Sequence, residues 1–346
     1  MTDAFRLPAE WEPQSAVLIA WPHADTDWGP RLGEVEETYV ALVCALTRFQ
    51  DVLICVADAD LQTYAEARLR SNRAEMARVR FIEAEYDDTW LRDSGPITLV
   101  AGEGDERRFA LLDFRFTGWG GKFEASRDDR LVERLHDAGT FHNSVRQSID
   151  FALEGGAIET DGRGTLLSTW RCLHERHPHA SREALTAQLA GWLRQDRVLW
   201  LDHGYLEGDD TDAHIDTLAR FAAPDAIVYQ GCDDPADTHY PELQAMAAQL
   251  ATLRTAGGHP YRLFALPWAR PILDQGRRLA ASYANFLIVN GAVLMPAYGD
   301  PADAAAAAVL ERAFPGREVV AIPCRPLIWQ NGSLHCITMQ LPHGAV

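Results

Sequence analysis

Short apolar segments alternate along the chain with longer segments whose apolar residues recur every three or four positions. The short segments are rich in β-branched and aromatic residues and end at Gly, Pro, Asn or Asp, which is typical of strands. The longer segments have the spacing of amphipathic helices. Alternation of the two predicts the α/β class. Strands are expected at 15–21, 51–57, 79–85, 96–101, 108–116, 164–169, 197–201, 226–231, 285–296, 317–323 and 335–341, and helices at 35–49, 182–194, 242–254 and 301–314.

Short polar breaks between these segments fall at regular distances. Asp93 in TWLRDSGP is followed 61 residues later by Glu154 in FALEGGAI, and 60 residues later by His214 in TDAHIDT. Cys336 in GSLHCIT lies 122 residues further on, which is two steps of 61, and the skipped position falls near Asn285. This spacing predicts five repeats of about 60 residues, arranged radially so that their turns meet at one axis.

Composition places the chain among globular cytoplasmic proteins. Its 346 residues, 47% of them hydrophobic, can bury a large core, and no apolar run approaches the roughly 18 to 20 residues that span a membrane. The N-terminal MTDAFRLPAEWEP does not resemble a secretory signal, and six cysteines without a CxxC pair suggest reduced thiols. A net charge of −18 argues against nucleic acid and is compatible with a small cationic ligand. We expect one cytoplasmic domain over residues 1–346.

The polar breaks would bring a thiol, an imidazole and several carboxylates to one pocket. Cys336 is a candidate nucleophile, because a fold can place a distant His and acids beside it. If a strand carries His214 and Asp216, both side chains point to the same face. Paired carboxylates suit a planar guanidinium, which binds them through its fork of N–H donors. Trp90 and Trp21 could form aromatic walls.

Other readings of the polar residues are weaker. Zinc bound by Cys336, His214 and an Asp lacks the usual ligand spacing, so no metal is expected. TGWGGKF (117–123) does not fit a phosphate loop, and Cys44 and Cys55 lie in apolar patterns typical of buried thiols. The HERHPH run is expected to be a solvated loop rather than a metal site, because Arg176 and Pro178 interrupt its three histidines, His174, His177 and His179.

Several motifs in fixed order together resemble one family. The chain is similar to agmatine deiminases and related bacterial peptidylarginine-deiminase-type proteins of the guanidine-modifying superfamily, over about residues 8–342. The resemblance implies a five-fold pseudosymmetric α/β propeller, in agreement with the step of about 60 residues. The motifs are PAEWEPQSAVLIAWPH, DDTWLRDSGP, GWGGKF, EGGAIETDGRGTLLST, DDTDAHIDTLARF, SYANFLIVNGAVLMP and GSLHCITMQLP.

The resemblance also implies a reaction: hydrolytic deimination of a guanidine, with agmatine the first candidate, through an S-alkylthiouronium intermediate and without metal or cofactor. The products would be N-carbamoylputrescine and ammonia. The implied roles are nucleophile for Cys336, general acid and base for His214, guanidinium-binding carboxylates for Asp93 and Asp216, an acid contacting substrate or His214 for Glu154, and an aromatic neighbour of the substrate for Trp90.

The chain departs from the family pattern around the nucleophile. QNGSLHC stands where related enzymes have a glycine-rich stretch, so Asn331 and Ser333 are expected to narrow the pocket or add donors near the substrate tail. Asp210 stands where the family more often has Glu. Asp210 or Asp212 could receive the distal ammonium of agmatine.

Alternative functions use the same residues. A deiminase of free, peptidyl or methylated arginine would need a cation for the substrate carboxylate, with Arg92 and Arg115 the nearest candidates, although Arg92 would alternate away from Asp93 on a strand. Amidino transfer would need a site closed to water. The intact thiol, imidazole and three acids weigh against a non-catalytic protein that binds cationic solutes. Related enzymes suggest a homodimer.

Overall fold

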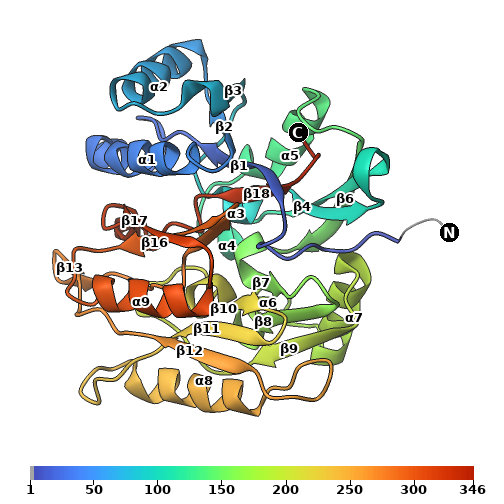
Figure 1. The fold of residues 1–346 in the computed structure, drawn as a ribbon, viewed down its shortest axis with the longest axis vertical. Helices are drawn as coiled ribbons and strands as arrows, with labels where there is room; N and C mark the ends of the chain where they lie inside the picture. The colour runs from blue at the N-terminus through green and yellow to red at the C-terminus, as the bar shows by residue number, and fades with distance from the viewer. Residues whose placement is uncertain (1–3) are drawn as a thin grey trace.

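A computed structural model describes residues 4–346 and confirms the mixed α/β class (Figure 1). Its described residues form six sheets, of which five have three or four strands. In the four three-stranded sheets, the first strand pairs antiparallel with the second, and the second pairs parallel with the third. The four-stranded sheet has the order β18 (Met339–Pro342), β1 (Gln14–Ala20), β2 (Asp51–Val56) and β3 (Val79–Glu83). The three-stranded sheets consist of β4 (Ile97–Ala101), β5 (Arg108–Arg115) and β6 (Ser144–Ala152); of β7 (Ile158–Thr160), β8 (Thr165–Thr169) and β9 (Arg197–Leu201); of β10 (Ala219–Ala223), β11 (Ala226–Gln230) and β12 (Arg262–Leu266); and of β15 (Leu287–Val289), β16 (Ala292–Ala297) and β17 (Glu318–Pro323). The sixth sheet is a hairpin of β13 (Leu273–Asp274) and β14 (Arg277–Arg278).

Helices make the crossover connections that parallel strand pairs require. In the four-stranded sheet, the C-terminal strand β18 pairs antiparallel with β1, and β1, β2 and β3 run parallel, so both ends of the chain meet in one sheet. None of the described helices is both long and apolar enough to cross a membrane. The α-helices are α1 (Leu32–Leu46), α2 (Ala59–Ser71), α3 (Leu91–Ser94), α4 (Gly118–Gly121), α5 (Leu131–Asp137), α6 (Trp170–Arg176), α7 (Arg182–Leu193), α8 (Tyr240–Thr252) and α9 (Asp303–Ala313).

The polar breaks found in the sequence have equivalent places in this fold. Asp93 lies in α3 before β4, Glu154 precedes β7, and His214 precedes β10. Asn285 and Cys336 precede β15 and β18 in the same way. Each therefore lies before the first strand of its sheet, which explains the regular spacing of the breaks.

Two predictions about these breaks are wrong. The strand expected from residue 335 begins only at Met339, and the loop that carries Cys336 consists of irregular turns. His214 and Asp216 do not share a strand, because Asp216 lies in a single 3₁₀ turn, η6 (Ile215–Thr217), that begins after His214. The segment precedes β10, a strand that the apolar pattern did not reveal.

Candidate active site

Cys336 lines an open cavity of about 920 Å³, and the residue is only 3% exposed. Its Sγ atom is 3.3 Å from Nδ2 of Asn285 and 3.6 Å from Oδ2 of Asp216. Oδ1 of Asn285 accepts hydrogen bonds from the backbone N–H groups of His335, at 2.9 Å, and Cys336, at 3.4 Å. Asn285 thus holds both the thiol and its loop. The sequence placed Asn285 at a break but did not identify it as a site residue.

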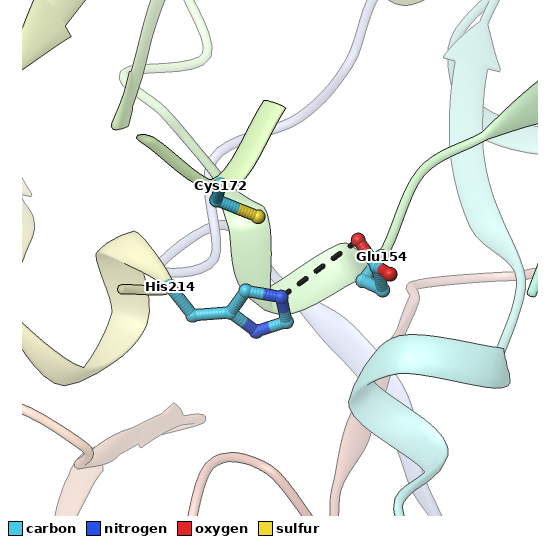
Figure 2. Close-up of side chains that lie close together, drawn as sticks. All are labelled: Glu154, Cys172 and His214. Atoms are coloured by element: carbon cyan, nitrogen blue, oxygen red, sulfur yellow. Dashed lines mark ion pairs between the residues drawn. The ribbon is translucent and has the colours of Figure 1, made fainter. Parts of the chain in front are cut away.

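The imidazole of His214 is completely buried between two carboxylates. Nδ1 lies 3.6 Å from Oδ1 of Asp93, and Nε2 lies 3.8 Å from Oε2 of Glu154 (Figure 2). Within residues 4–346, neither ring nitrogen has a hydrogen-bond partner, and neither does this Glu154 oxygen. Because buried polar atoms are normally satisfied, these atoms point to a ligand that brings its own donors and acceptors.

Electrostatics favour a protonated His214 and a neutral thiol in the free protein. Burial lowers the pKa of His214, but Asp93, Cys172 and Glu154 outweigh it and raise that pKa well above its ordinary value. Burial, with Asp216 and Asp93 beside the sulfur, raises the pKa of the Cys336 thiol well above its ordinary value. A cation bound between the acids and the sulfur would reverse the second effect, because it stabilises a thiolate.

Glu154, Cys172 and His214 point toward one another and form a group that could hold a metal ion (Figure 2). Their ligand atoms lie within 4.8 Å of one another. Two features disfavour a metal there. Arg176 donates to Glu154 at 2.6 Å, which places a positive charge against the group, and a metal would have to displace a proton from His214.

Asp93 is fixed by two hydrogen bonds from other elements. Its Oδ1 accepts from the backbone N–H of Gly156 at 2.9 Å, and its Oδ2 accepts from Nε1 of Trp119 at 2.9 Å. A Cβ at Gly156 would lie 2.6 Å from Nδ1 of His214, so only glycine allows this close approach. Trp119 belongs to the GWGGKF stretch, in which the sequence indicated no function beyond family resemblance.

Arg176 links Glu154 of the site to a second ion pair, between Asp212 and Lys122. Its side chain is 2% exposed, and it donates from Nε to Glu154 and from Nη1 to Asp212, each at 2.6 Å. Asp212 also accepts from Lys122 at 2.8 Å. The prediction that this arginine lies in a solvated loop is therefore wrong, because α6 points it inward. Asp212, expected near the substrate tail, is engaged by these two cations and lies outside the residues that line the cavity.

Aromatic and acidic side chains line the cavity above Cys336. Trp90 is there as expected, packed on Trp28 with ring centroids 5.6 Å apart, and Trp119 provides a second wall. Gly332 allows this packing, because a Cβ there would lie 2.2 Å from the Trp90 ring. Asp210 and Asn331, both predicted tail residues, also line the cavity, and Asn331 donates to Asp210. The other acids of the lining are Asp25, Asp27, Asp87, Asp88, Asp93, Glu124, Asp128 and Asp274.

Four expected pocket residues lie elsewhere. Trp21 is fully buried in the hydrophobic core against Tyr39, because its break follows β1, the second strand of its sheet. Ser333 is buried and bonds to Tyr298. Arg92 is buried and donates to Gln340 at 2.6 Å, and Arg115 pairs with Asp150 on the surface. Neither arginine lines the cavity, whereas Arg277, which the sequence did not single out, does.

Comparisons with known proteins agree on the family. The model of the Porphyromonas-type peptidyl-arginine deiminase family matches residues 6–342. Agmatine deiminase from Pseudomonas aeruginosa (strain UCBPP-PA14) is 34% identical over 365 residues, covering 98% of this chain and 96% of the relative. A crystal structure from Porphyromonas gingivalis, assigned provisionally to arginine deiminases, is 45% identical with a TM-score of 0.91, covering 99% and 100% of the two chains. A substrate-bound agmatine deiminase from C. jejuni is 32% identical with a TM-score of 0.89, covering 99% and 98%.

Proposed function

Because the chain belongs to the Porphyromonas-type peptidyl-arginine deiminase family, we propose that it is a hydrolase that deiminates agmatine to N-carbamoylputrescine and ammonia. One observation carries the proposal. Cys336, His214 and the acids Asp93, Glu154 and Asp216 come from four separate segments of the chain and converge at one site, and buried atoms of His214, Glu154 and Asp216 lack partners within residues 4–346.

The proposed reaction begins with guanidinium binding between Asp93 and Asp216. The cation lowers the pKa of the adjacent thiol, which releases its proton to solvent, and the Cys336 thiolate attacks the guanidinium carbon. His214, protonated in the free protein, gives its proton to the departing ammonia. Water then attacks the S-alkylthiouronium carbon while His214 takes one of its protons. The C–S bond breaks as the second proton of that water passes to the sulfur, which releases the ureido product and restores the neutral thiol. Because His214 serves as acid and then base, the site ends in its original protonation state.

The remaining carboxylates have supporting roles in this proposal. Glu154, whose Oε2 faces Nε2 of His214, would orient the imidazole and accept a substrate N–H. Burial raises the pKa of Glu154, but the nearby His214 imidazole and the charge of Arg176 outweigh it and lower that pKa overall. Glu154 therefore stays ionised beside a cation. Trp90 and Trp119 would enclose the alkyl chain, and Asp210 would lie near the distal ammonium.

We also propose that the five similar sheets are repeats of a five-fold α/β propeller formed by a single domain over residues 1–346. The repeated antiparallel and parallel pairing and the equivalent places of the five polar breaks support this arrangement. The family resemblance supports a homodimer, and the six free thiols support a cytoplasmic location. No metal or cofactor enters the proposed reaction.

One observation favours a second candidate, deimination of free or peptidyl arginine. Arg277 lines the cavity and could pair with a substrate carboxylate, although its guanidinium already bonds Asn331 and the backbone oxygen of Trp329. Many acids line the same cavity, which favours a substrate with a second positive charge and no carboxylate.

Formation of the ureido product, with release of ammonia or a methylated amine, from agmatine, arginine, dimethylarginine and an arginyl peptide tests both candidates. We expect the highest kcat/KM with agmatine and no release by Cys336→Ala. A protein that only binds cations would be stabilised by agmatine against thermal unfolding without releasing ammonia. Absence of turnover with the whole panel would reject the proposal.

A further inference from the structure

His335, the residue before Cys336, bridges two buried carboxylates and has no part in the reaction proposed above. Its Nδ1 lies 2.8 Å from Oδ2 of Asp216, and its Nε2 lies 2.8 Å from Oε2 of Glu10. The three side chains are buried, His335 to 1% exposure. Glu10 comes from the segment before β1, so the bridge joins the N-terminal region to the proposed nucleophile loop.

The bridge continues into a fully buried arginine. Arg220 donates from Nη2 to Oε2 of Glu10 and from Nε to Oε2 of Glu159, each at 2.7 Å. We call Asp216, His335, Glu10, Arg220 and Glu159 the buried ion chain. Replacing buried ion pairs by well-packed apolar residues is often neutral or stabilising, so such a chain is a weak device for stability. Its end at Asp216 points instead to a role in arranging the site.

Counting protons supports that role. Carboxylates only accept hydrogen bonds, so two bonds between one imidazole and two carboxylates need two protons. Either His335 is an imidazolium, or it is neutral and one carboxyl group is protonated. The trio carries one negative charge in both cases. Burial, with the charges of Arg220 and Arg92, lowers the pKa of His335 overall, although Glu10 and Asp216 oppose this. The two hydrogen bonds need the second proton whichever of the three groups carries it.

Asp216 depends on His335 for its orientation. Among the described residues, its Oδ1 has no hydrogen-bond partner. Its Oδ2 accepts from His335, and its other contact is the sulfur of Cys336 at 3.6 Å. Since Asn285 binds the N–H groups of both His335 and Cys336, this dipeptide fixes the thiol and the carboxylate relative to each other.

We infer that His335 is a positioning residue that holds the Asp216 carboxylate toward the guanidinium through the buried ion chain. The inference rests on the proposed function. It assigns His335 no contact with substrate and no proton transfer to it. Removing the imidazole should therefore weaken guanidinium binding more than it slows the chemical step.

Two amide variants of His335 separate this role from general packing. The side-chain amide of Asn can occupy the place of Nδ1 and donate to Asp216, whereas that of Gln reaches the place of Nε2, toward Glu10. We expect His335→Ala and His335→Gln to lower kcat/KM with the best substrate by about 10- to 100-fold, mainly through KM. His335→Asn should recover to within about threefold of the native value.

Glu10→Gln provides a second, independent variant in case the His335 variants fold poorly. Gln can still face Nε2 of His335, and a neutral His335 can then donate from Nδ1 to Asp216. The KM of Glu10→Gln should therefore stay within about threefold of the native value, and below that of His335→Gln. Binding of agmatine to each variant combined with Cys336→Ala, measured by calorimetry, should weaken in the same order. Thermal unfolding shows whether each variant is folded.

Three outcomes would overturn the inference: Asn and Gln variants of equal KM, a loss confined to kcat, or a Glu10→Gln variant as impaired as His335→Gln. Failure of the proposed function gives a different result, because the native chain would then release no ammonia from any guanidine.

Discussion

The Sγ atom of Cys336 lies 3.6 Å from Oδ2 of Asp216, so the proposed nucleophile is next to a carboxylate proposed to bind the substrate cation. This arrangement opposes thiolate formation in the free protein, because the carboxylate and burial both raise the pKa of the thiol. A guanidinium between them reverses the effect. The proposed site would thus activate its nucleophile only when a cation is bound, which protects the thiol from other electrophiles.

Removing the charge of Asp216 should lower the pKa of Cys336. We expect Asp216→Asn to shift the pH dependence of Cys336 alkylation by iodoacetamide, a neutral reagent, to lower pH than in the native chain. The Cys336→Ala variant shows how much of the measured alkylation comes from the other cysteines. An unchanged pH dependence would mean that Asp216 does not control the thiol.

The raised pKa of His214 should depend on Asp93. Asp93→Asn removes the nearest charge that favours the imidazolium, so the pKa of His214 should fall. The pKa of His214 is higher in the folded than in the unfolded protein, so protonation of His214 stabilises the fold below the unfolded-state pKa. This stabilisation is lost as the pH rises through the folded-state pKa. Asp93→Asn should therefore lower the free energy of unfolding more at acidic than at alkaline pH. NMR titration of the His214 ring and unfolding across pH measure both effects. If the variant lost the same amount of stability at all pH values, the charge of Asp93 would not be the cause of the raised pKa of His214.

The sequence predicted most residues of the candidate site, because polar side chains at loops leave clear breaks in an apolar pattern. Asp93, Glu154, His214 and Cys336 were found in this way. It could not reveal contacts that depend on how distant turns pack. Arg176 looked solvated because the pattern does not show that α6 turns it toward Glu154.

The errors also have physical causes. Trp21 was expected at the site because its break resembles the others, but that break follows a second strand and its side chain packs in the core. Strands such as β6 were missed because Ser144–Ala152 is largely exposed and polar, and its pairing with β5 rather than its own apolar pattern defines it.

Gly332 should not tolerate a side chain, because a Cβ there would overlap the ring of Trp90. Gly332→Ala should displace Trp90, destabilise the protein by about 1–3 kcal/mol and lower kcat/KM. Gly191→Ala is a matched control, since no atom lies within 4 Å of its added Cβ and it lies in α7, where Ala is the better helix former. Native-like activity and stability of Gly332→Ala would contradict the assigned packing.

Arg176 should be essential for stability, because it neutralises the buried Glu154. Arg176→Ala should destabilise the protein by about 3–5 kcal/mol, as expected when one partner of a buried pair is removed. The lowered pKa of Glu154 contributes stability above its unfolded pKa that is lost as pH falls through the folded pKa, so the effect of the variant should shrink in acid. Arg70→Ala, which breaks an exposed pair with Glu66, should cost at most about 1 kcal/mol in urea unfolding.

Arg277 should decide between the two candidate substrates. It lines the cavity among many acids, and its guanidinium bonds Asn331 and the carbonyl of Trp329. If the substrate is agmatine, Arg277 repels its distal ammonium, and Arg277→Ala should keep or raise kcat/KM for agmatine while any activity with arginine falls. If the substrate carries a carboxylate, the native chain should prefer arginine or an arginyl peptide. Arg277→Ala should then lower kcat/KM for that substrate by about tenfold or more, because a lost charged contact costs about 1.4 kcal/mol or more. Because acids outnumber Arg277 in the cavity, we expect the first result, and the ratio of the two kcat/KM values in native and variant protein measures it.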